Sequence, residues 1–202
     1  MQPFTIISYF TPGPYEEAAH NYLMPSVQKL NLNSDIRRVD SRGSWNANTS
    51  YKSEFVLSML EIHKSNVVFL DCDAIINSYP QLFHGIPEEY NIAAHTLDRN
   101  LWYNRDYLNT RYELLTGTAF FRYSEKTLEI VKKWVDECKR TPQIWEQKIL
   151  ENIIKNDDVN IFPLPISYCY IFSLPDNSPP IVKCENPIIV HMQKSRELRN
   201  KV

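Results

Sequence analysis

The sequence predicts an α/β fold built around a parallel sheet. Apolar strand segments and amphipathic helical segments alternate along the N-terminal part of the chain, which is typical of βαβ units. The segment 66–70, Asn-Val-Val-Phe-Leu, also contains an unbroken run of large apolar residues. Such a short β-branched and aromatic run is typical of a central strand covered on both faces.

Periodicity and turn residues predict the elements of the first half in order. The segment 4–11 is expected to be a strand that ends at the turn Thr-Pro-Gly-Pro. Apolar residues at helical spacing follow over 15–30, with a kink expected at Pro25. The next expected elements are a strand at 35–40, a polar loop at 41–49, and a helix with an apolar face of Phe55, Val56, Met59, Leu60 and His63.

The second half is expected to hold shorter elements and more surface loops. A short helix at 79–83 and a strand at 90–95 precede the polar segment 96–112, which has little periodicity and suits a surface region. The remaining expected elements are a strand at 114–121, a helix at 128–138, a helix capped by Thr141 and opened by Pro142 that ends near 156, and short strands between prolines, the last at 187–194.

Two carboxylates follow the apolar run directly, in the sequence Asp71-Cys72-Asp73. Open α/β sheets bind ligands at the carboxyl ends of their strands. In an extended backbone the two side chains point to opposite sides, whereas a turn that starts at Cys72 lets both converge on one cation. The alternative is that the aspartates only cap the next turn.

Composition excludes several broad classes of protein. Of the 202 residues, 43% are hydrophobic and 23% charged, which suits one domain over 1–202 with a flexible basic tail at 194–202. A net charge of −2 gives no general attraction to nucleic acid or anionic membranes. The cysteines are widely spaced, and the sequence contains neither a signal peptide nor a membrane span. We therefore expect a cytoplasmic protein with reduced thiols.

Several segments in this order resemble the nucleotide-diphospho-sugar transferases of the GT-A glycosyltransferase fold. The segments that carry the resemblance are Gly43-Ser44-Trp45 with Asn48 and Lys52, the strand ending in Asp71-Cys72-Asp73, the segment 92–95, and the segment 115–121 before a helix containing Trp134. The resemblance spans the chain from Thr11 to about Lys194. It implies a Rossmann-like mixed, mostly parallel sheet flanked by helices.

The resemblance implies a metal-dependent enzyme that moves a sugar from a nucleotide-diphosphate-sugar, expected to be a UDP-sugar, to an acceptor hydroxyl. Asp71 and Asp73 would then hold Mn²⁺ or Mg²⁺, His191 would supply a further ligand, and Lys194 would contact phosphate. Carboxylates suit a hard cation that neutralises the leaving diphosphate, and an imidazole favours Mn²⁺. Two features depart from the family pattern: Cys72 stands between the aspartates, and no glycine separates His191 from Lys194.

Other residues are candidates for contacting the donor. Lys52 is a second candidate phosphate cation, unless it faces solvent as most lysines do. The candidates on the nucleotide side are Thr11, Tyr15 and Trp45, where an aromatic ring can cover a base or simply pack. Gly117, next to Thr118, permits close approach of backbone to ligand, although a turn or bulge explains a glycine equally well.

Besides metal ligands and donor contacts, the reaction requires a catalytic base if it inverts the anomeric carbon. An inverting transfer needs a carboxylate to take the proton of the acceptor hydroxyl. Glu146, near the start of the helix after Pro142, resembles the position of that base, with Asp98 and Asp106 as competitors. The alternative is that Glu146 only favours the first helical turn electrostatically. The acceptor itself stays open among a glycan, a protein, a small molecule and a hydroxylated nucleic-acid base.

Two other functions fit parts of the pattern. An apolar strand that ends in Asp-x-Asp also resembles haloacid-dehalogenase-like phosphatases, with Asp71 as nucleophile, Asp73 as acid, Thr96 after a strand, and Asp157 with Asp158 as metal ligands. In that family the motif lies near the chain start and is followed by threonine, whereas Ala74 follows here. A non-catalytic module that binds nucleotide-sugars or glycans is the remaining alternative.

Overall fold

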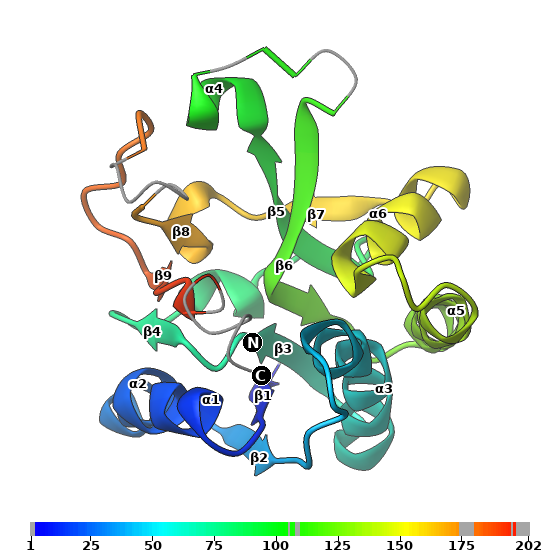
Figure 1. The fold of residues 1–202 in the computed structure, drawn as a ribbon, viewed down its shortest axis with the longest axis horizontal. Helices are drawn as coiled ribbons and strands as arrows, with labels where there is room; N and C mark the ends of the chain where they lie inside the picture. The colour runs from blue at the N-terminus through cyan, green and yellow to red at the C-terminus, as the bar shows by residue number, and fades with distance from the viewer. Residues whose placement is uncertain (1–2, 105, 108–109, 174–179, 195, 197–202) are drawn as a thin grey trace.

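A computed structural model of the chain describes residues 3–104, 106–107, 110–173, 180–194 and 196 (Figure 1). A six-stranded sheet has the order β2-β1-β3-β6-β5-β7. Its strands are β1 (Phe4–Phe10), β2 (Ser34–Arg38), β3 (Asn66–Leu70), β5 (Ile92–Asp98), β6 (Tyr112–Phe121) and β7 (Ile161–Pro163). Only β6 runs antiparallel to its neighbours in this sheet, so the predicted mixed, mostly parallel α/β architecture is confirmed.

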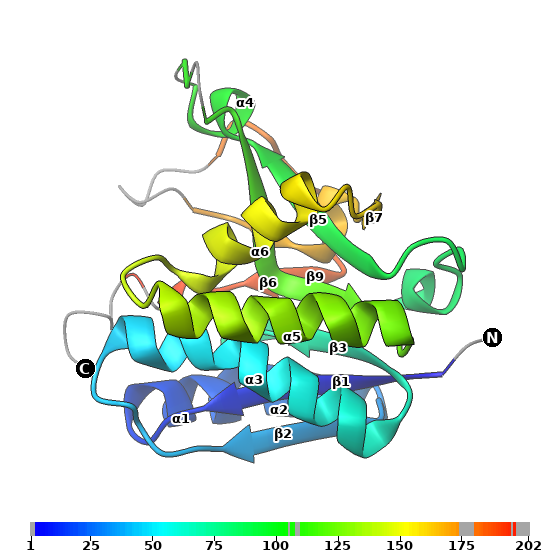
Figure 2. The same cartoon turned by 90° about the vertical axis from the view of Figure 1, so that its right-hand side faces the viewer.

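Helices cover one face of the sheet, and helices together with a small second sheet cover the other (Figures 1 and 2). The first face carries α3 (Trp45–His63), α5 (Glu125–Arg140) and α6 (Glu146–Asn156). The second carries α1 (Pro14–Ala18), the π-helical η1 (Ala19–Leu23), α2 (Met24–Lys29), the short 3₁₀ helices η2 (Gln81–His84) and η3 (Ile166–Tyr168), and a sheet of β4 (Ala74–Ile76), β9 (Ile189–His191) and β8 (Tyr170–Ile171).

Strand β3 connects the two hydrophobic cores. Val67 and Phe69 pack into the core under α3 and α5, whereas Val68 and Leu70 pack into the core on the opposite face. All five residues of β3 are buried. The prediction of a central strand covered on both faces is thereby confirmed, and it fixes the position of the aspartates that follow.

The helix type changes next to Pro25, where a kink was expected. Proline has no N–H and its ring conflicts with the carbonyl four residues earlier, so a regular helix cannot pass through it unchanged. The backbone responds just before Pro25 with the π-helical segment η1, in which the N–H of Met24 donates to the carbonyl of Ala19. The helical segment expected at 15–30 is therefore divided into α1, η1 and α2.

Two helix starts were predicted wrongly. Ser44 caps α3 by accepting a hydrogen bond from the N–H of Ala47 at 3.2 Å, so the helix begins at Trp45 inside the expected loop. Thr141 does not open α6, because its hydroxyl and N–H bond the carbonyl of Glu137 and complete α5 instead. Trp145 is the N-cap residue of α6, whose end at Asn156 agrees with the prediction.

The polar segment 96–112, expected to be a surface loop, contains regular elements among its described residues. Strand β5 continues to Asp98, α4 (Arg99–Tyr103) follows, and β6 begins at Tyr112. We call residues 95–104 and 110–115 the wing, because this part projects beyond the rest of the sheet in both views (Figures 1 and 2). Residues 105, 108 and 109 lie outside the described part of the chain.

The last described strand lies beside the turn that follows β3. Strand β9, which the sequence predicted within 187–194, pairs with β4 in a register that places His191 opposite Ala74, just beyond the aspartates. Of the basic tail expected at 194–202, only Lys194 and Arg196 are among the described residues. All four cysteines are free thiols. No described helix is both long and apolar enough to cross a membrane.

Candidate functional site

A cavity of about 370 Å³ opens where β3 ends. Its walls come from the end of β1, from α1 and α3, from the turn after β3, from the wing, from the start of α6 and from the segment around β9. Because β3 lies between β1 and β6 in the sheet, the turn after β3 occupies the middle of this cavity. Its size is that of a small-molecule site.

The turn after β3 brings the two aspartates together. The N–H of Asp71 donates to the carbonyl of Gly117 on β6 at 2.9 Å, and the N–H of Ala74 donates to the carbonyl of Asp71 at 3.0 Å. The backbone therefore turns at once instead of staying extended. Ligand atoms of Asp71, Asp73 and His191 all lie within 4.8 Å of one another, a spacing that one metal ion can bridge.

His191 completes this cluster from the far end of the chain. The residue is 1% exposed, and Nε2 lies 2.8 Å from the hydroxyl oxygen of Thr118. Nδ1 has no hydrogen-bond partner among the described residues and lies 3.9 Å from Oδ1 of Asp73. Burial alone lowers the pKa of His191, but nearby Cys169, Asp73 and Asp71 outweigh it and raise the pKa to about 10. A buried, unpartnered nitrogen beside two carboxylates fits a metal ligand.

Gly117 makes room for these side chains. A Cβ atom at this position would lie 3.0 Å from Oδ2 of Asp71 and 3.0 Å from Cε1 of His191. A larger residue at position 117 would therefore push the side chains of Asp71 and His191 out of place. The groups that approach Gly117 are protein side chains, so its predicted close approach to a ligand stays a prediction.

Asp73 also holds the C-terminal segment in place. Its Oδ2 accepts a hydrogen bond from the backbone N–H of Lys194 at 2.7 Å, and its carbonyl accepts one from Met192 at 3.3 Å. Asp73 is 7% exposed. It is thus more than a cap of the following turn, because it connects the segments around β3 and β9.

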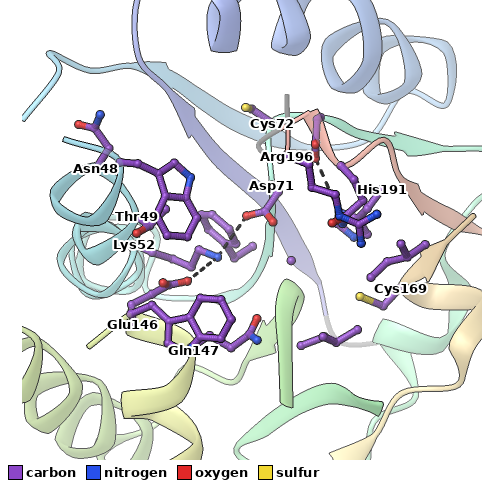
Figure 3. Close-up of a pocket in the computed structure, with 18 of the residues that line it drawn as sticks. Asn48, Thr49, Lys52, Asp71, Cys72, Glu146, Gln147, Cys169, His191 and Arg196 are labelled. Carbon is purple, nitrogen blue, oxygen red and sulfur yellow. Dashed lines mark ion pairs between the residues drawn. The ribbon is translucent and has the colours of Figure 1, made fainter. Parts of the chain in front are cut away.

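A second charged cluster lies on the other side of Asp71 (Figure 3). Nζ of Lys52, on α3, is 3.1 Å from Oδ1 of Asp71 and 3.0 Å from Oε1 of Glu146. The same nitrogen donates to the hydroxyl of Thr116 at 3.2 Å. Burial alone lowers the pKa of Lys52, but the two carboxylates outweigh it and raise the pKa well above its usual range. Lys52, predicted as a phosphate cation, therefore already neutralises two acidic side chains.

Glu146 reaches the cavity from the first residue of α6. It is 5% exposed, and the indole N–H of Trp134 fixes its backbone by donating to the Glu146 carbonyl at 2.8 Å. The competing candidates for the base, Asp98 and Asp106, lie away from this position. Asp98 caps α4 and accepts from Arg111 at 2.7 Å, which lowers the pKa of Asp98, and neither it nor Asp106 is among the described residues that line the cavity.

Most of the predicted site residues meet in this one cavity. Those that line it are Thr11, Tyr15, Trp45, Lys52, Asp71, Cys72, Asp73, Gly117, Glu146 and His191. Burial raises the pKa of Tyr15 to about 12, so its hydroxyl stays protonated at neutral pH. Thr118 and Lys194 lie beside the cavity, where they hold His191 and bond Asp73 through the backbone.

The sequence analysis missed several residues of the cavity wall. Glu113, Gln147, Cys169 and Arg196 all line it. Glu113 and Arg196 lie in polar segments with no periodicity, so nothing local marked them. Gln147 directly follows Glu146 near the start of α6, and that position was the one available signal.

The phosphatase alternative required other acidic groups near Asp71. Asp157 instead bonds Nζ of Lys133 at 2.7 Å at the end of α6, and Thr96 is exposed on the wing. Thr96, Asp157 and Asp158 are all absent from the described cavity lining. The geometry therefore gives that alternative no support.

Known proteins share both the sequence pattern and the fold. The profile of the family described as nucleotide-diphospho-sugar transferase matches residues 18–202. A glycosyltransferase involved in the glycosylation of the major capsid of PBCV-1 superposes with a TM-score of 0.69 at 19% identity, over 98% of this chain and 98% of that one. Mouse xyloside xylosyltransferase 1, in its apo form, gives 0.60 at 10% identity over 95% and 98%.

A third structure, the glycosyltransferase GlyE of Streptococcus pneumoniae TIGR4, gives a TM-score of 0.59 at 14% identity over 95% of this chain and 55% of GlyE. No curated protein sequence matches the chain. At these identities the structures establish the fold, which is that of GT-A glycosyltransferases. With a profile match that covers most of its length, the chain belongs to the nucleotide-diphospho-sugar transferase family.

Proposed function

We propose that the protein is a metal-dependent glycosyltransferase that uses a UDP-sugar as donor and a hydroxyl group as acceptor. The convergence of Asp71, Asp73 and His191 at the end of β3 carries this proposal. A sugar–nucleotide bond breaks by losing a diphosphate, whose growing negative charge must be neutralised. Two carboxylates and an unpartnered imidazole nitrogen are suitable ligands for a cation that does this.

Asp71, Asp73 and His191 would hold Mn²⁺ or Mg²⁺, with Mn²⁺ favoured by the imidazole ligand. When bound, such a cation supplies Lewis-acid stabilisation of the leaving diphosphate. The protein's own part is to fix the ligands before the donor arrives. Gly117 leaves the space they need, Thr118 orients the imidazole through Nε2, and the backbone of Lys194 orients Asp73.

The donor nucleoside would lie toward the end of β1, where Thr11, Tyr15 and Trp45 line the cavity. Its diphosphate would lie at the aspartates, where Lys194 is the candidate phosphate cation because it directly follows the segment that holds His191. Lys52 would act mainly by holding Asp71 and Glu146 at fixed positions. Cys72 contributes to the same wall.

Glu146 is the proposed base if the transfer inverts the anomeric carbon. It lies on the cavity wall. Its Oε1 is 3.0 Å from Nζ of Lys52, and Lys52 together with the hydroxyl of Thr116 fixes its orientation. General-base catalysis requires a carboxylate that is close to the acceptor hydroxyl and correctly oriented. Among the three acids considered from the sequence, only Glu146 lines the cavity.

A thermal-shift panel of UDP, GDP and TDP, each with and without Mn²⁺, tests the proposal. A ligand that binds only the folded state stabilises it by about 2.7 kcal/mol at a concentration of 100 times Kd. We expect UDP to raise Tm, and the rise to depend on Mn²⁺. Stabilisation by no nucleotide, or equal stabilisation without metal, would contradict the proposal. Turnover of UDP-sugars then separates an enzyme from a binding module.

A further inference from the structure

The cavity has a second end, on the wing, that the donor contacts proposed above leave unused. Side chains from β5, α4, β6 and β8 line it. They are Leu97, Tyr103, Leu115 and Ile171, which belong to or pack against one buried hydrophobic cluster. This end of the cavity is therefore an apolar surface on a rigid support.

Two polar side chains lie at the edge of this apolar surface. The amide Nε2 of Gln147 donates to Oε1 of Glu113 at 2.9 Å. The amide oxygen of Gln147 accepts from the N–H of Thr116 at 3.2 Å, and it shares the one hydroxyl hydrogen of Thr116 with Oε1 of Glu146, each 3.3 Å from that hydroxyl. These bonds fix the orientation of the amide and, through it, that of the carboxylate.

The charge at this edge is negative on the cavity side. The Glu113 side chain is 21% exposed and lines the cavity, and its Oε2 is 3.5 Å from Nε of Arg99. Arg99 is not among the described residues that line the cavity. Figure 3 shows the cation Arg196 beside His191, whereas Gln147 lies beside Glu146 across the cavity. Burial raises the pKa of Tyr103 while Arg196 lowers it, so the charge of Arg196 reaches the Tyr103 side of the wing end. A ligand beside Gln147 instead meets the Glu113 carboxylate.

An apolar surface with hydrogen-bond acceptors along one edge matches the chemistry of a pyranose. A sugar ring presents C–H groups on its faces and hydroxyl donors around its rim, and sites for such ligands combine apolar contacts with a few placed polar groups. A carboxylate accepts hydrogen bonds from hydroxyls but repels a carboxylate or phosphate on the ligand, and such repulsion is a source of specificity.

We propose that the wing end is the acceptor subsite, that it takes an uncharged sugar, and that Glu113 excludes acidic sugars. This inference rests on the proposed function, which places the diphosphate at the aspartates and the nucleoside toward β1. The wing then lies beyond the transferred sugar. Gln147 directly follows Glu146 on α6, so a sugar held by Gln147 and Glu113 has its hydroxyl close to the proposed base.

Matched acceptors test the inference without knowledge of the natural one. The probes are p-nitrophenyl glucoside and galactoside and the corresponding glucuronide and galacturonide, which differ only in a carboxylate at C6. Burial raises the pKa of Glu113, so transfer from a UDP-sugar with Mn²⁺ is measured at about pH 8, which favours the ionised carboxylate over the protonated one. We expect kcat/KM to favour an uncharged glycoside by at least about tenfold.

Variants of Glu113 identify the source of that preference. Glu113→Gln keeps the shape and should reduce the preference at least about fivefold, with donor KM unchanged, whereas Glu113→Asp keeps the charge and should retain it. Glu61→Gln, a change of the same charge at an exposed position of α3 outside the cavity, should leave it unchanged. Equal Tm values show that the variants are folded.

Three results would overturn the inference alone, and a fourth would overturn the proposed function with it. The preference could persist in Glu113→Gln, or that variant could change donor KM instead, which would assign the wing end to the donor sugar. A wild-type protein that hydrolyses the donor but glycosylates neither uncharged probe would also overturn it, while leaving the proposed function standing. Failure to bind or hydrolyse any UDP-sugar would instead overturn the proposed function and the inference together.

Discussion

Asp71 belongs to two clusters that differ in how completely their charges are satisfied. On one side, Lys52 neutralises Asp71 and Glu146 at 3.1 and 3.0 Å, and Thr116 adds hydrogen bonds. On the other side, two carboxylates and a buried imidazole converge, and Nδ1 of His191 has no hydrogen-bond partner among the described residues. The first cluster is complete within the protein, whereas the second keeps an unpartnered nitrogen that the proposed cation would bind.

Because of this difference, we expect the two clusters to contribute to different properties, one to folding stability and the other to binding. A closed ion-pair network holds its members in position, and removing Lys52 leaves the buried Glu146 and the partly exposed Asp71 unpaired. An open cluster keeps ligand positions available, and its loss mainly affects what binds there. We therefore expect substitutions in the Lys52 cluster to lower the free energy of unfolding and those around His191 to lower metal affinity.

The largest expected effect is from Asp73→Asn. The amide can still accept the hydrogen bond from Lys194 N–H, so the C-terminal segment stays in place, but one anionic ligand is lost. We expect Mn²⁺-dependent UDP binding to disappear and transfer to fall by about 10³-fold, equivalent to about 4 kcal/mol. Calorimetric titration of UDP with Mn²⁺ measures this, and unchanged affinity would show that Asp73 is not a ligand.

Lys52→Met is expected to cost about 3–5 kcal/mol of the free energy of unfolding, because it leaves Asp71 and the buried Glu146 unpaired. Urea denaturation measures the loss. The matched control is the double variant Lys52→Met with Glu146→Leu, which should recover much of the stability since a well-packed apolar replacement of a buried pair is often neutral. A single variant as stable as the wild type would refute the assignment of Lys52 as the neutralising group.

Glu146→Gln distinguishes a catalytic role of Glu146 from a structural role in the cluster with Lys52 and Asp71. The amide keeps the shape and helix propensity, so donor binding should be unchanged. Transfer should fall at least about a hundredfold, because general-base catalysis contributes about 10²–10⁴-fold. Single-turnover kinetics with saturating donor checks this. A loss of only a few-fold would assign Glu146 a structural role or indicate a retaining mechanism.

The smallest effect is expected from Thr118→Val, which should act only on the cluster of Asp71, Asp73 and His191. The substitution removes the hydroxyl that lies 2.8 Å from Nε2 of His191 while keeping a β-branched residue in β6. Loss of such an orienting partner typically lowers metal affinity by about 10–100-fold. Titration with Mn²⁺ measures the change. An affinity equal to that of the wild type would mean that His191 needs no orientation to bind metal.

The sequence predicted one cluster much better than the other. The apolar run of β3 followed directly by Asp71 and Asp73 is a local pattern, and the resemblance supplied His191 although it lies 73 residues beyond Thr118. The role of Lys52 was not predictable in the same way. Its partners Asp71 and Glu146 come from other elements, and only the folded sheet brings them within reach.

The wing shows a different limit of sequence-based prediction. Its sequence mixes polar residues with buried apolar ones such as Leu97 and Leu115, without a clear periodicity. The pairing of Leu97 with Glu113 across β5 and β6 is what places that carboxylate beside the apolar surface. Strand register of this kind depends on pairing partners distant in the sequence, so Glu113 was not recognised as a site residue.

The central claim is that residues from two distant segments hold one cation. Electron spin echo envelope modulation of the protein with one equivalent of Mn²⁺ and excess UDP tests it directly, because the method detects a ¹⁴N nucleus bound to the metal. The account predicts an imidazole nitrogen coupling that His191→Ala removes. Mn²⁺ that binds with UDP but shows no nitrogen coupling in the wild type would contradict it.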